Sequence, residues 1–216
     1  MYLPAQFDVR DRALALELMR EHSFASLVTV DDDGLPFVSH LPTVVQARDG
    51  AQADWVVWCH CARANAQWRH LEARPRARLI YLGPHAYMSP SVYPDLARVP
   101  TWNYLAVHCV VEARLVDSPR DKDVLLKRLI ARNEPAYARQ WRELGEEFQQ
   151  KMLAGIVGME LRVIDLQCKI KLNQHRPESH AALHGVYAAG SPDEQALARW
   201  MERLGMAAAP AEGEAQ

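Results

Sequence analysis

The segments Gly83–Tyr93 and Val99–Tyr104 hold the densest set of chemically useful side chains in this 216-residue sequence. They combine aromatic rings, hydroxyl groups and an asparagine amide with several prolines. Each proline fixes its own backbone angle and disfavours helix at the preceding residue, so the sequence predicts ordered irregular structure, with extended pieces joined by turns. Such a surface suits a planar ligand, with rings to stack on and polar groups to orient it. The same composition also fits a loop that anchors its rings in the edge of the core.

A second chemical feature, Arg63-Ala64-Asn65, lies between a predicted strand and a predicted helix. A helix N-terminus offers unpaired backbone N–H groups and the positive end of the helix dipole, so Arg63 and Asn65 are candidates for holding a phosphate. The alternative is an asparagine that caps the helix beside a solvated arginine. The spacing leaves both interpretations open.

The Cys59-His60-Cys61 triplet raises the question of zinc, because thiolates and imidazole are its preferred ligands. In a strand, however, both cysteines lie on one face and His60 on the other. Cys109 and Cys168 are likewise embedded in apolar runs, and there is no Cys-x-x-Cys pair. We therefore expect free buried thiols, with neither a metal site nor a disulfide framework.

The sequence lacks the common signatures of catalysis and nucleotide binding. It contains no Gly-x-Ser-x-Gly nucleophile motif and no glycine-rich phosphate loop. The nine histidines are scattered singly, and His40 and His108, the candidate proton donors, have no evident base to pair with. No catalytic residue is predicted.

Composition predicts an ordinary globular protein, with 49% hydrophobic and 24% charged residues. A formal net charge of −2 gives no electrostatic footprint for DNA, which usually appears as a basic domain or stripe. No apolar run follows a basic N-terminus, and no run approaches the length of a membrane span. We expect a cytoplasmic protein without membrane contact.

The N-terminal part predicts a helix followed by a hairpin. Asp8 is a candidate cap for a helix that ends near His22. Phe24–Val30 is a β-branched apolar strand, and Asp31–Gly34 is a turn signal before a second strand over Leu35–Val45. Pro36 and Pro42 within that second strand indicate an edge or bulged strand.

The middle of the chain alternates strands with short connections. Trp55–His60 predicts a strand, Arg63–Arg74 a helix stopped by Pro75, and Arg78–Leu82 another strand. Val107–Leu115 alternates apolar with polar residues, as half-buried strands do. Because regular crossover helices are missing, we predict an α+β fold with a mostly antiparallel barrel.

Three helices are expected after this barrel segment, as an insertion over about residues 118–154. Ser118 caps the first, the second follows Pro135, and the third runs from Glu146 to Leu153. A late strand over Val157–Val163 is expected to complete the sheet.

The C-terminal part predicts one further helix. Ser191-Pro192-Asp193-Glu194 is a capping box, and the helix that it begins ends at Gly205. Residues 1–206 are predicted to form a single domain, with the C-terminal helix as an appendage, and residues 207–216 a disordered tail.

Several short motifs, in order, resemble the PaiB family of FMN-binding negative transcriptional regulators. They are Met1-Tyr2-Leu3-Pro4, Ser39-His40-Leu41-Pro42, Ala62-Arg63-Ala64-Asn65, Gly83-Pro84-His85-Ala86-Tyr87, Pro100-Thr101-Trp102-Asn103-Tyr104, Gly155-Ile156-Val157-Gly158 and Lys169 with Lys171-Leu172. The sequence departs from the family pattern at Cys61, Ala66, Val92, Asn173 and His175.

This resemblance implies a split β-barrel of the pyridoxamine-phosphate-oxidase type, a homodimer, and FMN held where the subunits meet. It places the phosphate at Arg63 and Asn65, with help from Lys171. The flavin ring is expected against Ser39, His40, Thr101, Trp102 and Asn103, and Gln174 belongs to the C-terminal signature. The alternatives are a flavin- or haem-using oxidoreductase on the same barrel, and a ligand-free dimer whose aromatic residues are simply core.

Overall fold

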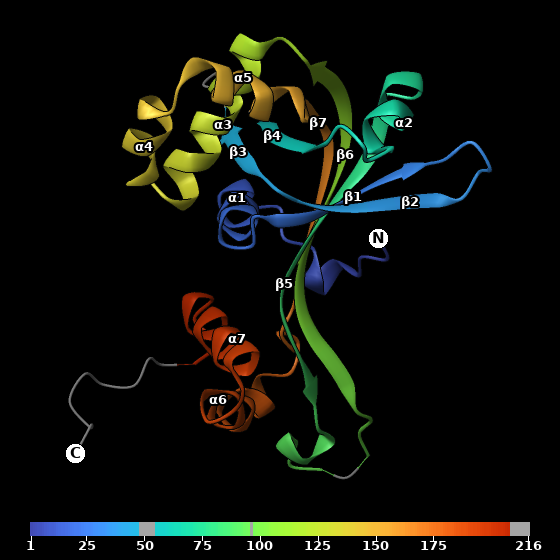
Figure 1. Ribbon diagram of the computed structural model, residues 1–216. Helices are drawn as coiled ribbons and strands as arrows, with labels where there is room; N and C mark the ends of the chain where they lie inside the picture. The colour runs from blue at the N-terminus through green and yellow to red at the C-terminus, as the bar shows by residue number, and fades with distance from the viewer. Residues whose placement is uncertain (48–54, 96, 208–216) are drawn as a thin grey trace. The chain divides into compact units, whose positions relative to one another are not determined.

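The computed structural model describes residues 1–47, 55–95 and 97–207. They form a seven-stranded sheet of order β2-β1-β5-β6-β7-β4-β3, accompanied by helices (Figure 1). The strands are β1 Phe24–Val30, β2 Pro36–Pro42, β3 Val44–Ala47, β4 Trp55–Ala62, β5 Arg76–Met88, β6 Thr101–Val116 and β7 Ile156–Lys171. The helices are α1 Arg12–Glu21, α2 Gln67–Ala73, α3 Pro119–Asn133, α4 Tyr137–Glu143, α5 Glu146–Ala154, α6 His180–Ala188 and α7 Pro192–Arg203. The antiparallel sheet confirms the predicted α+β class.

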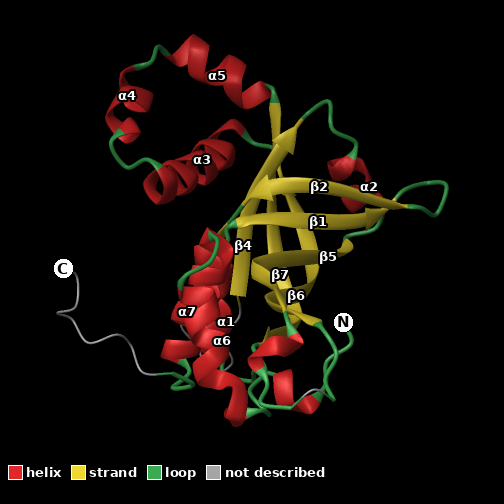
Figure 2. Cartoon of the chain, turned by 90° about the horizontal axis from the view of Figure 1, so that it is seen from below, coloured by secondary structure: helices red, strands yellow, loops and turns green. Residues whose placement is uncertain are grey.

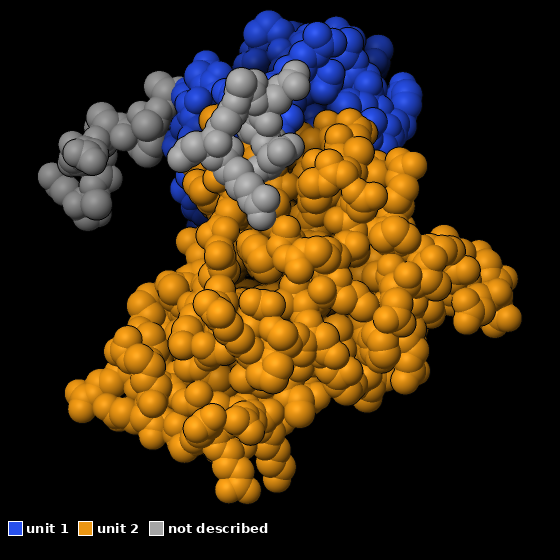
Figure 3. Space-filling view, turned by 90° about the horizontal axis from the view of Figure 1, so that it is seen from above, with its two compact units in different colours: residues 1–12, 82–106, 167–216 blue, residues 13–81, 107–166 orange. Residues whose placement is uncertain are grey.

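The chain divides into two compact units (Figure 3). Unit 1 comprises residues 1–12, 82–106 and 167–216, and unit 2 comprises residues 13–81 and 107–166. The long strands β5, β6 and β7 contribute residues to both units. The single domain over residues 1–206 stays a prediction.

Unit 2 is a curled sheet with an apolar interior. Alternate side chains of its strands point inward, and Leu27, Cys59, Leu79, Val111 and Met159 are fully buried. Burial of such aliphatic side chains supplies most of the stabilisation that a barrel of this kind has. The sheet therefore has one fixed inner face, and polar side chains of the strands are directed to its outer face.

The predicted hairpin is present in unit 2, with β1 and β2 paired from Phe24–Pro42 to Val30–Pro36. Its turn is stabilised by the Asp31 carboxylate, which accepts hydrogen bonds from two backbone N–H groups, and by Gly34 at φ +82°. Strand β2 forms one edge of the sheet. The edge position inferred from Pro36 and Pro42 is confirmed.

The predicted strand over Leu35–Val45 is wrong as one element, because it breaks at Thr43. The backbone N–H and the hydroxyl of Thr43 both donate to the Ser23 carbonyl at 2.8 Å, which takes this residue out of the ladder. The following strand β3 pairs with β4 instead of β1. Strands β2 and β4 approach each other without ladder bonds, so the barrel stays open along this line.

Helices α3, α4 and α5 form the predicted insertion in unit 2 (Figure 2). The Ser118 hydroxyl accepts the backbone N–H of Asp121 at 3.1 Å, and Pro119 occupies the first helical turn, as predicted. Leu125 and Leu129 are the buried apolar positions of α3. Gly155 ends α5, close to the predicted boundary.

In unit 1, helix α7 packs on helix α6, and Tyr187 of α6 contacts Tyr87 of β5 and Asn103 of β6. The Ser191 capping box at the start of α7 is confirmed, with both reciprocal hydrogen bonds present. The apolar face of α7, including Leu197, Trp200 and Met201, is buried within the chain itself. Helix α6 was not predicted, because its N-terminal residue Ser179 makes no side-chain cap and the helix is short.

Two further predictions near these elements are wrong. Asp8 does not cap the first helix, since it follows a 3-10 turn over Ala5–Phe7 and forms a bridge to Lys169, while α1 begins at Arg12. The segment around Pro84 is strand rather than irregular, because β5 continues to Met88. The pairing of β5 with β1 ends at Ile80, so the missing N–H of Pro84 breaks no bond there.

Between β5 and β6, the described residues 89–95 and 97–100 lie outside the strands, with a 3-10 turn at Pro90–Val92. The predicted disordered tail, residues 207–216, lies outside the described residues apart from Ala207.

Candidate functional site

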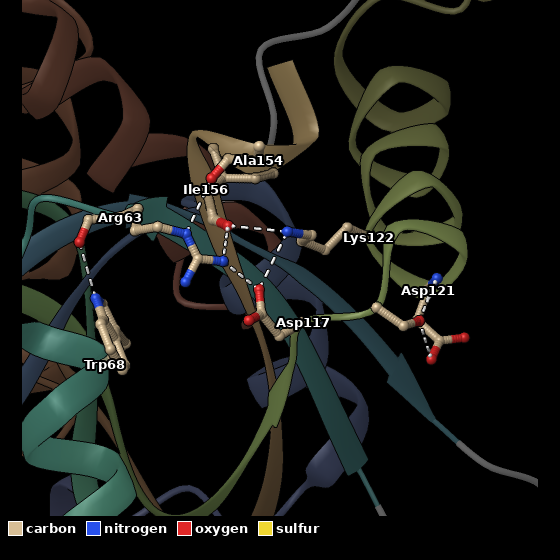
Figure 4. A network of polar contacts seen from close by, with 8 residues as sticks. Arg63, Trp68, Asp117, Asp121, Lys122, Ala154 and Ile156 are labelled. Atoms are coloured by element: carbon tan, nitrogen blue, oxygen red, sulfur yellow. Dashed lines mark hydrogen bonds and ion pairs between the residues drawn. The ribbon is translucent and has the colours of Figure 1, made fainter. Parts of the chain in front are cut away.

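Arg63 does not begin a helix, since α2 starts four residues later at Gln67. Its side chain reaches the ends of the helical insertion instead (Figure 4). Nε donates to the Ala154 carbonyl at 2.9 Å, and Nη2 donates to the Ile156 carbonyl at 3.3 Å and to the Asp117 carboxylate. Two of its nitrogens are therefore engaged by the chain itself.

Asp117 is shared by two cations. Lys122 Nζ lies 3.1 Å from the same carboxylate oxygen and 3.3 Å from the Ile156 carbonyl (Figure 4). Although burial works in the opposite direction, the hydrogen bonds from Lys122 and Arg63 hold the pKa of Asp117 below its usual value. One carboxylate facing two cations leaves the cluster of Arg63, Asp117 and Lys122 with one excess positive charge.

Asn65 lies just before helix α2 and satisfies its first amide, although the N-cap position itself belongs to Ala66. Its Oδ1 accepts the backbone N–H of Gln67 at 2.9 Å, and its Nδ2 donates to the Ser39 hydroxyl at 2.9 Å. The structure thus brings together two of the predicted site residues, Ser39 from β2 and Asn65 from the β4–α2 connection. Both lie in unit 2.

His40 lies on the outer face of the β1–β2 hairpin. Its Nδ1 is 2.9 Å from the Ser26 hydroxyl, and its ring is 6.2 Å from the ring of Phe24. His108 lies on β6, where burial lowers its pKa. Among the described contacts, neither histidine has a carboxylate partner that would make it a general acid or base.

Unit 1 carries an exposed aromatic surface, here called the ring face, formed by His85, Tyr87, Trp102 and Tyr104. Trp102 is 55% exposed, and its ring centroid is 6.3 Å from those of His85 and Tyr87. His85 and Tyr87 alternate on β5, and Trp102 and Tyr104 alternate on β6, so each pair projects from one side of its strand. Exposed rings in such a group are typical of a surface that binds something.

Two lysines of β7 adjoin the ring face. Lys169 is almost fully buried, lies 5.0 Å from the Tyr104 ring centroid and donates to the Tyr2 carbonyl at 3.1 Å. Lys171 donates to the Thr101 hydroxyl. Burial, followed by the charge of Lys169, lowers the pKa of Lys171. Neither lysine has a carboxylate partner among the ion pairs of the described residues, so the pair is suited to an anion.

The other two predicted residues of unit 1 are committed to its own structure. Asn103 is fully buried and donates to the Tyr187 hydroxyl at 3.0 Å and to the Met88 sulfur at 3.4 Å. It therefore points away from the neighbouring Trp102. Gln174 uses both ends of its amide to close the turn after β7, accepting from Leu172 N–H and donating to the Ile170 carbonyl.

The sequence predicts Thr101, Trp102 and Lys171 as contact residues but not His85, Tyr87, Tyr104 and Lys169, and all of these assignments stay predictions. The period-two spacing of these residues on their strands was the available signal. Asp117 and Lys122 were missed as partners of Arg63, because nothing in the sequence relates positions so far apart.

No group of three His, Cys, Asp or Glu side chains in the described part of the chain is placed to hold a metal ion. Cys59, Cys61, Cys109 and Cys168 are free and buried. Desolvation raises the pKa of Cys168 to about 12, so this thiol stays protonated and unreactive. None of the described helices is long and apolar enough to span a membrane.

Comparison with known proteins gives a family match over most of the chain. The family model described as "Putative FMN-binding domain" matches residues 1–165. The protease synthase and sporulation protein PAI 2 of Bacillus subtilis is 34% identical over 187 residues, which is 83% of this chain and 84% of that protein.

Solved structures with a similar fold include two proteins named for flavin or haem. A flavocytochrome from Azotobacter vinelandii is 17% identical with a TM-score of 0.58, covering 76% of this chain and 69% of that one. An FAD- and haem-binding protein from Mycobacterium smegmatis is 15% identical with a TM-score of 0.58, covering 76% and 73%. At these identities the likeness concerns the fold alone. The family match and the identity to PAI 2 together show that the chain belongs to the PaiB family of FMN-binding-domain proteins.

Proposed function

We propose that this protein binds FMN and acts as a PaiB-type negative regulator of transcription, as a cytoplasmic homodimer. The flavin proposal rests on the ring face of unit 1 and on two lysines of β7 that have no carboxylate partner among the described residues. FMN has a flat tricyclic ring and a dianionic phosphate, and this surface offers stacking and positive charge together. The regulatory part rests on family membership and on the name of the PAI 2 relative.

Trp102 and Tyr87 are the residues that we assign to the flavin ring, since both are about half exposed. Thr101 precedes Trp102 in β6, and its hydroxyl accepts a hydrogen bond from Lys171; we assign polar contacts with the ligand to these two residues. Ser39 and His40 of unit 2 are the separate candidates for the ring that the family resemblance implies. Bound FMN would supply a redox-active ring, while the protein residues would hold and orient it.

The phosphate has two candidate positions. Arg63 with Asn65 is the first, and a phosphate there would use the remaining Nη1 of Arg63 or replace Asp117 at Nη2. Lys171 is the second, and it would have to release only the neutral Thr101 hydroxyl. Comparing FMN with riboflavin separates the two, because riboflavin lacks only the phosphate.

If Arg63 contacts the phosphate, Arg63→Ala should lower FMN affinity about ten- to a hundredfold, as for a hydrogen bond to a charged group, and leave riboflavin nearly unchanged. If Lys171 does, Lys171→Met should show this contrast instead. Trp102→Ala should weaken both ligands alike. Titration by flavin fluorescence decides, with Lys127→Met as a control distant in sequence. Unchanged binding of both flavins in a folded Trp102→Ala variant would remove the ring face from the site.

The nature of the cofactor and its use can be tested on the purified protein. We expect a flavin absorption spectrum, a co-purifying mass equal to FMN, and no reduction by NADH or NADPH. Rapid reduction would favour an oxidoreductase, and absence of any flavin after supplementation would favour a ligand-free protein.

Dimerisation is tested by light scattering at micromolar concentration, with the dimer mass expected. The exposed ring face supports it, because large apolar rings are seldom left in water. The apolar face of α7 does not support it, since the chain covers that face itself. A monomer mass would contradict the dimer.

A further inference from the structure

A groove of about 300 Å³ opens on unit 2 where strands β1 and β5 separate. The two strands pair at Ser26–Ile80, Leu27–Leu79 and Val28–Arg78. The pairing stops there, although β1 continues to Val30 and β5 starts two residues earlier, at Arg76. The groove therefore occupies a place where a continued ladder would have closed the sheet.

The walls of the groove are apolar. Val28 and Val30 come from β1, Pro36 from β2, and Val110 from β6. Val30 is 49% exposed, so apolar surface faces solvent here. The volume is at the low end of the range for ligand pockets, so an occupant of this groove is small.

Two guanidinium groups of β5 also line the groove, those of Arg76 and Arg78. They are two residues apart on one strand and therefore project from the same side of it. Both are exposed, and neither has a hydrogen bond or ion pair among the contacts of the described residues. Burial lowers the pKa of His108 on the neighbouring strand β6, and the charges of the N-terminal amine and of Arg78 act in the same direction.

We propose that this groove binds a small organic acid, with the acid group on Arg76 and Arg78 and an aliphatic body on Val28, Val30, Pro36 and Val110. The planar fork of a guanidinium matches a carboxylate, and the apolar walls match an aliphatic chain. The proposal is independent of the flavin site, because none of these residues is assigned to FMN. Such a site would let the protein respond to a metabolite as well as to its flavin.

Hexanoate and its neutral counterpart hexanamide are the probes, titrated by ligand-observed NMR against the full-length protein with its flavin. Hexanoate should bind, and hexanamide at least about fivefold more weakly, because only the charged group gains from the arginines. Arg76→Gln and Arg78→Gln should each weaken hexanoate about threefold, and the double variant about tenfold, within the range for exposed ion pairs. The matched control is Arg120→Gln, an exposed arginine of α3 that should change nothing.

A second variant tests the position without removing an arginine. Val30→Glu places a carboxylate beside the two guanidiniums and should block hexanoate, while flavin absorbance and thermal unfolding stay as in the parent. Equal binding of hexanoate and hexanamide, no binding of hexanoate, or unchanged binding in the double arginine variant would each overturn the proposal. If the double arginine variant still bound hexanoate but changed its oligomeric state, the groove would be a contact between subunits. That result would also overturn the proposal. Loss of flavin binding alone would count against the flavin site and not against this one.

Discussion

Gly158 of β7 lies where there is no room for a larger side chain. It pairs with His60, and a Cβ added there would lie 3.0 Å from both Leu125 Cδ1 and the Val116 carbonyl oxygen. The backbone oxygen cannot move aside as a side chain can, so the contact between α3 and the sheet depends on glycine.

Gly158→Ala should therefore lower the free energy of unfolding by about 1–3 kcal/mol, the usual cost of overpacking. Gly185→Ala is the matched control, because nothing lies within 4 Å of its Cβ position in helix α6. That change should stabilise by about 0.5–1 kcal/mol through helix propensity. Urea unfolding measures both, and equal effects would show that the contact at Gly158 relaxes.

The side chain of Asp117 should make the stability of the folded protein depend on pH. Its pKa is lowered in the folded protein, so its contribution is complete above the unfolded pKa of about 3.9 and is lost as pH falls through the folded value. Asp117→Asn should lower stability by about 0.5–1 kcal/mol at neutral pH, since the carboxylate is partly exposed. The difference from the parent should shrink toward pH 3, whereas Asp33→Asn should show little difference at either pH. If the stability difference between Asp117→Asn and the parent protein persisted in acid, the loss would come from altered geometry and not from the lost charge.

At the scale of elements, one hydroxyl joins helix α6 to strand β6. The Tyr187 hydroxyl accepts the N–H of the fully buried Asn103, whose Oδ1 has no hydrogen-bond partner among the residues that the structure describes. Burial raises the pKa of Tyr187 to about 12, so the hydroxyl stays neutral at physiological pH.

Tyr187→Phe should cost about 1–3 kcal/mol, because it leaves the buried Asn103 amide with only the weak Met88 sulfur as acceptor. Tyr2→Phe is the control, since Tyr2 is 85% exposed and phenylalanine keeps its ring. Chemical denaturation of both variants tests the difference. A loss no larger than that of the control would mean that the Asn103 amide finds another acceptor.

Elements with strong local signals could be predicted from the sequence. Ser118 and Ser191 cap helices, and Asp31–Gly34 forms a turn, because these interactions involve residues only a few positions apart. The break at Thr43 and the extension of β5 through Pro84 could not be predicted, since both depend on which strand is the neighbour.

The same limit applies to the candidate site. The motif around Arg63 locates a strand-to-helix connection, but the partners of its guanidinium come from residues 117, 154 and 156. The alternation along β5, β6 and β7 was visible, yet only the folded sheet brings Thr101 to Lys171 and His85 to Trp102.

For the molecule as a whole, net charge decides the expected behaviour toward DNA. With a net charge of −2, we expect weak and strongly salt-dependent binding to a random duplex. Fluorescence anisotropy at low and at physiological salt tests this, with a basic DNA-binding domain as the reference. Tight binding to a random duplex at physiological salt would reveal a basic surface formed by several copies.

The hydrogen bonds of the Arg63 guanidinium connect the two ends of the helical insertion. Asp117 precedes α3, and Ala154 and Ile156 border the end of α5. Helices α3, α4 and α5 can therefore unfold together while their two ends stay fixed on the intact sheet. Such a unit opens with a single local free energy, lower than that of global unfolding. In native-state hydrogen exchange, the amides of the three helices would then form one group with a common opening rate, while those of β4 and β7 remain protected. Arg63→Ala would accelerate the hydrogen exchange of these helix amides and leave the exchange of the barrel strands almost unaltered.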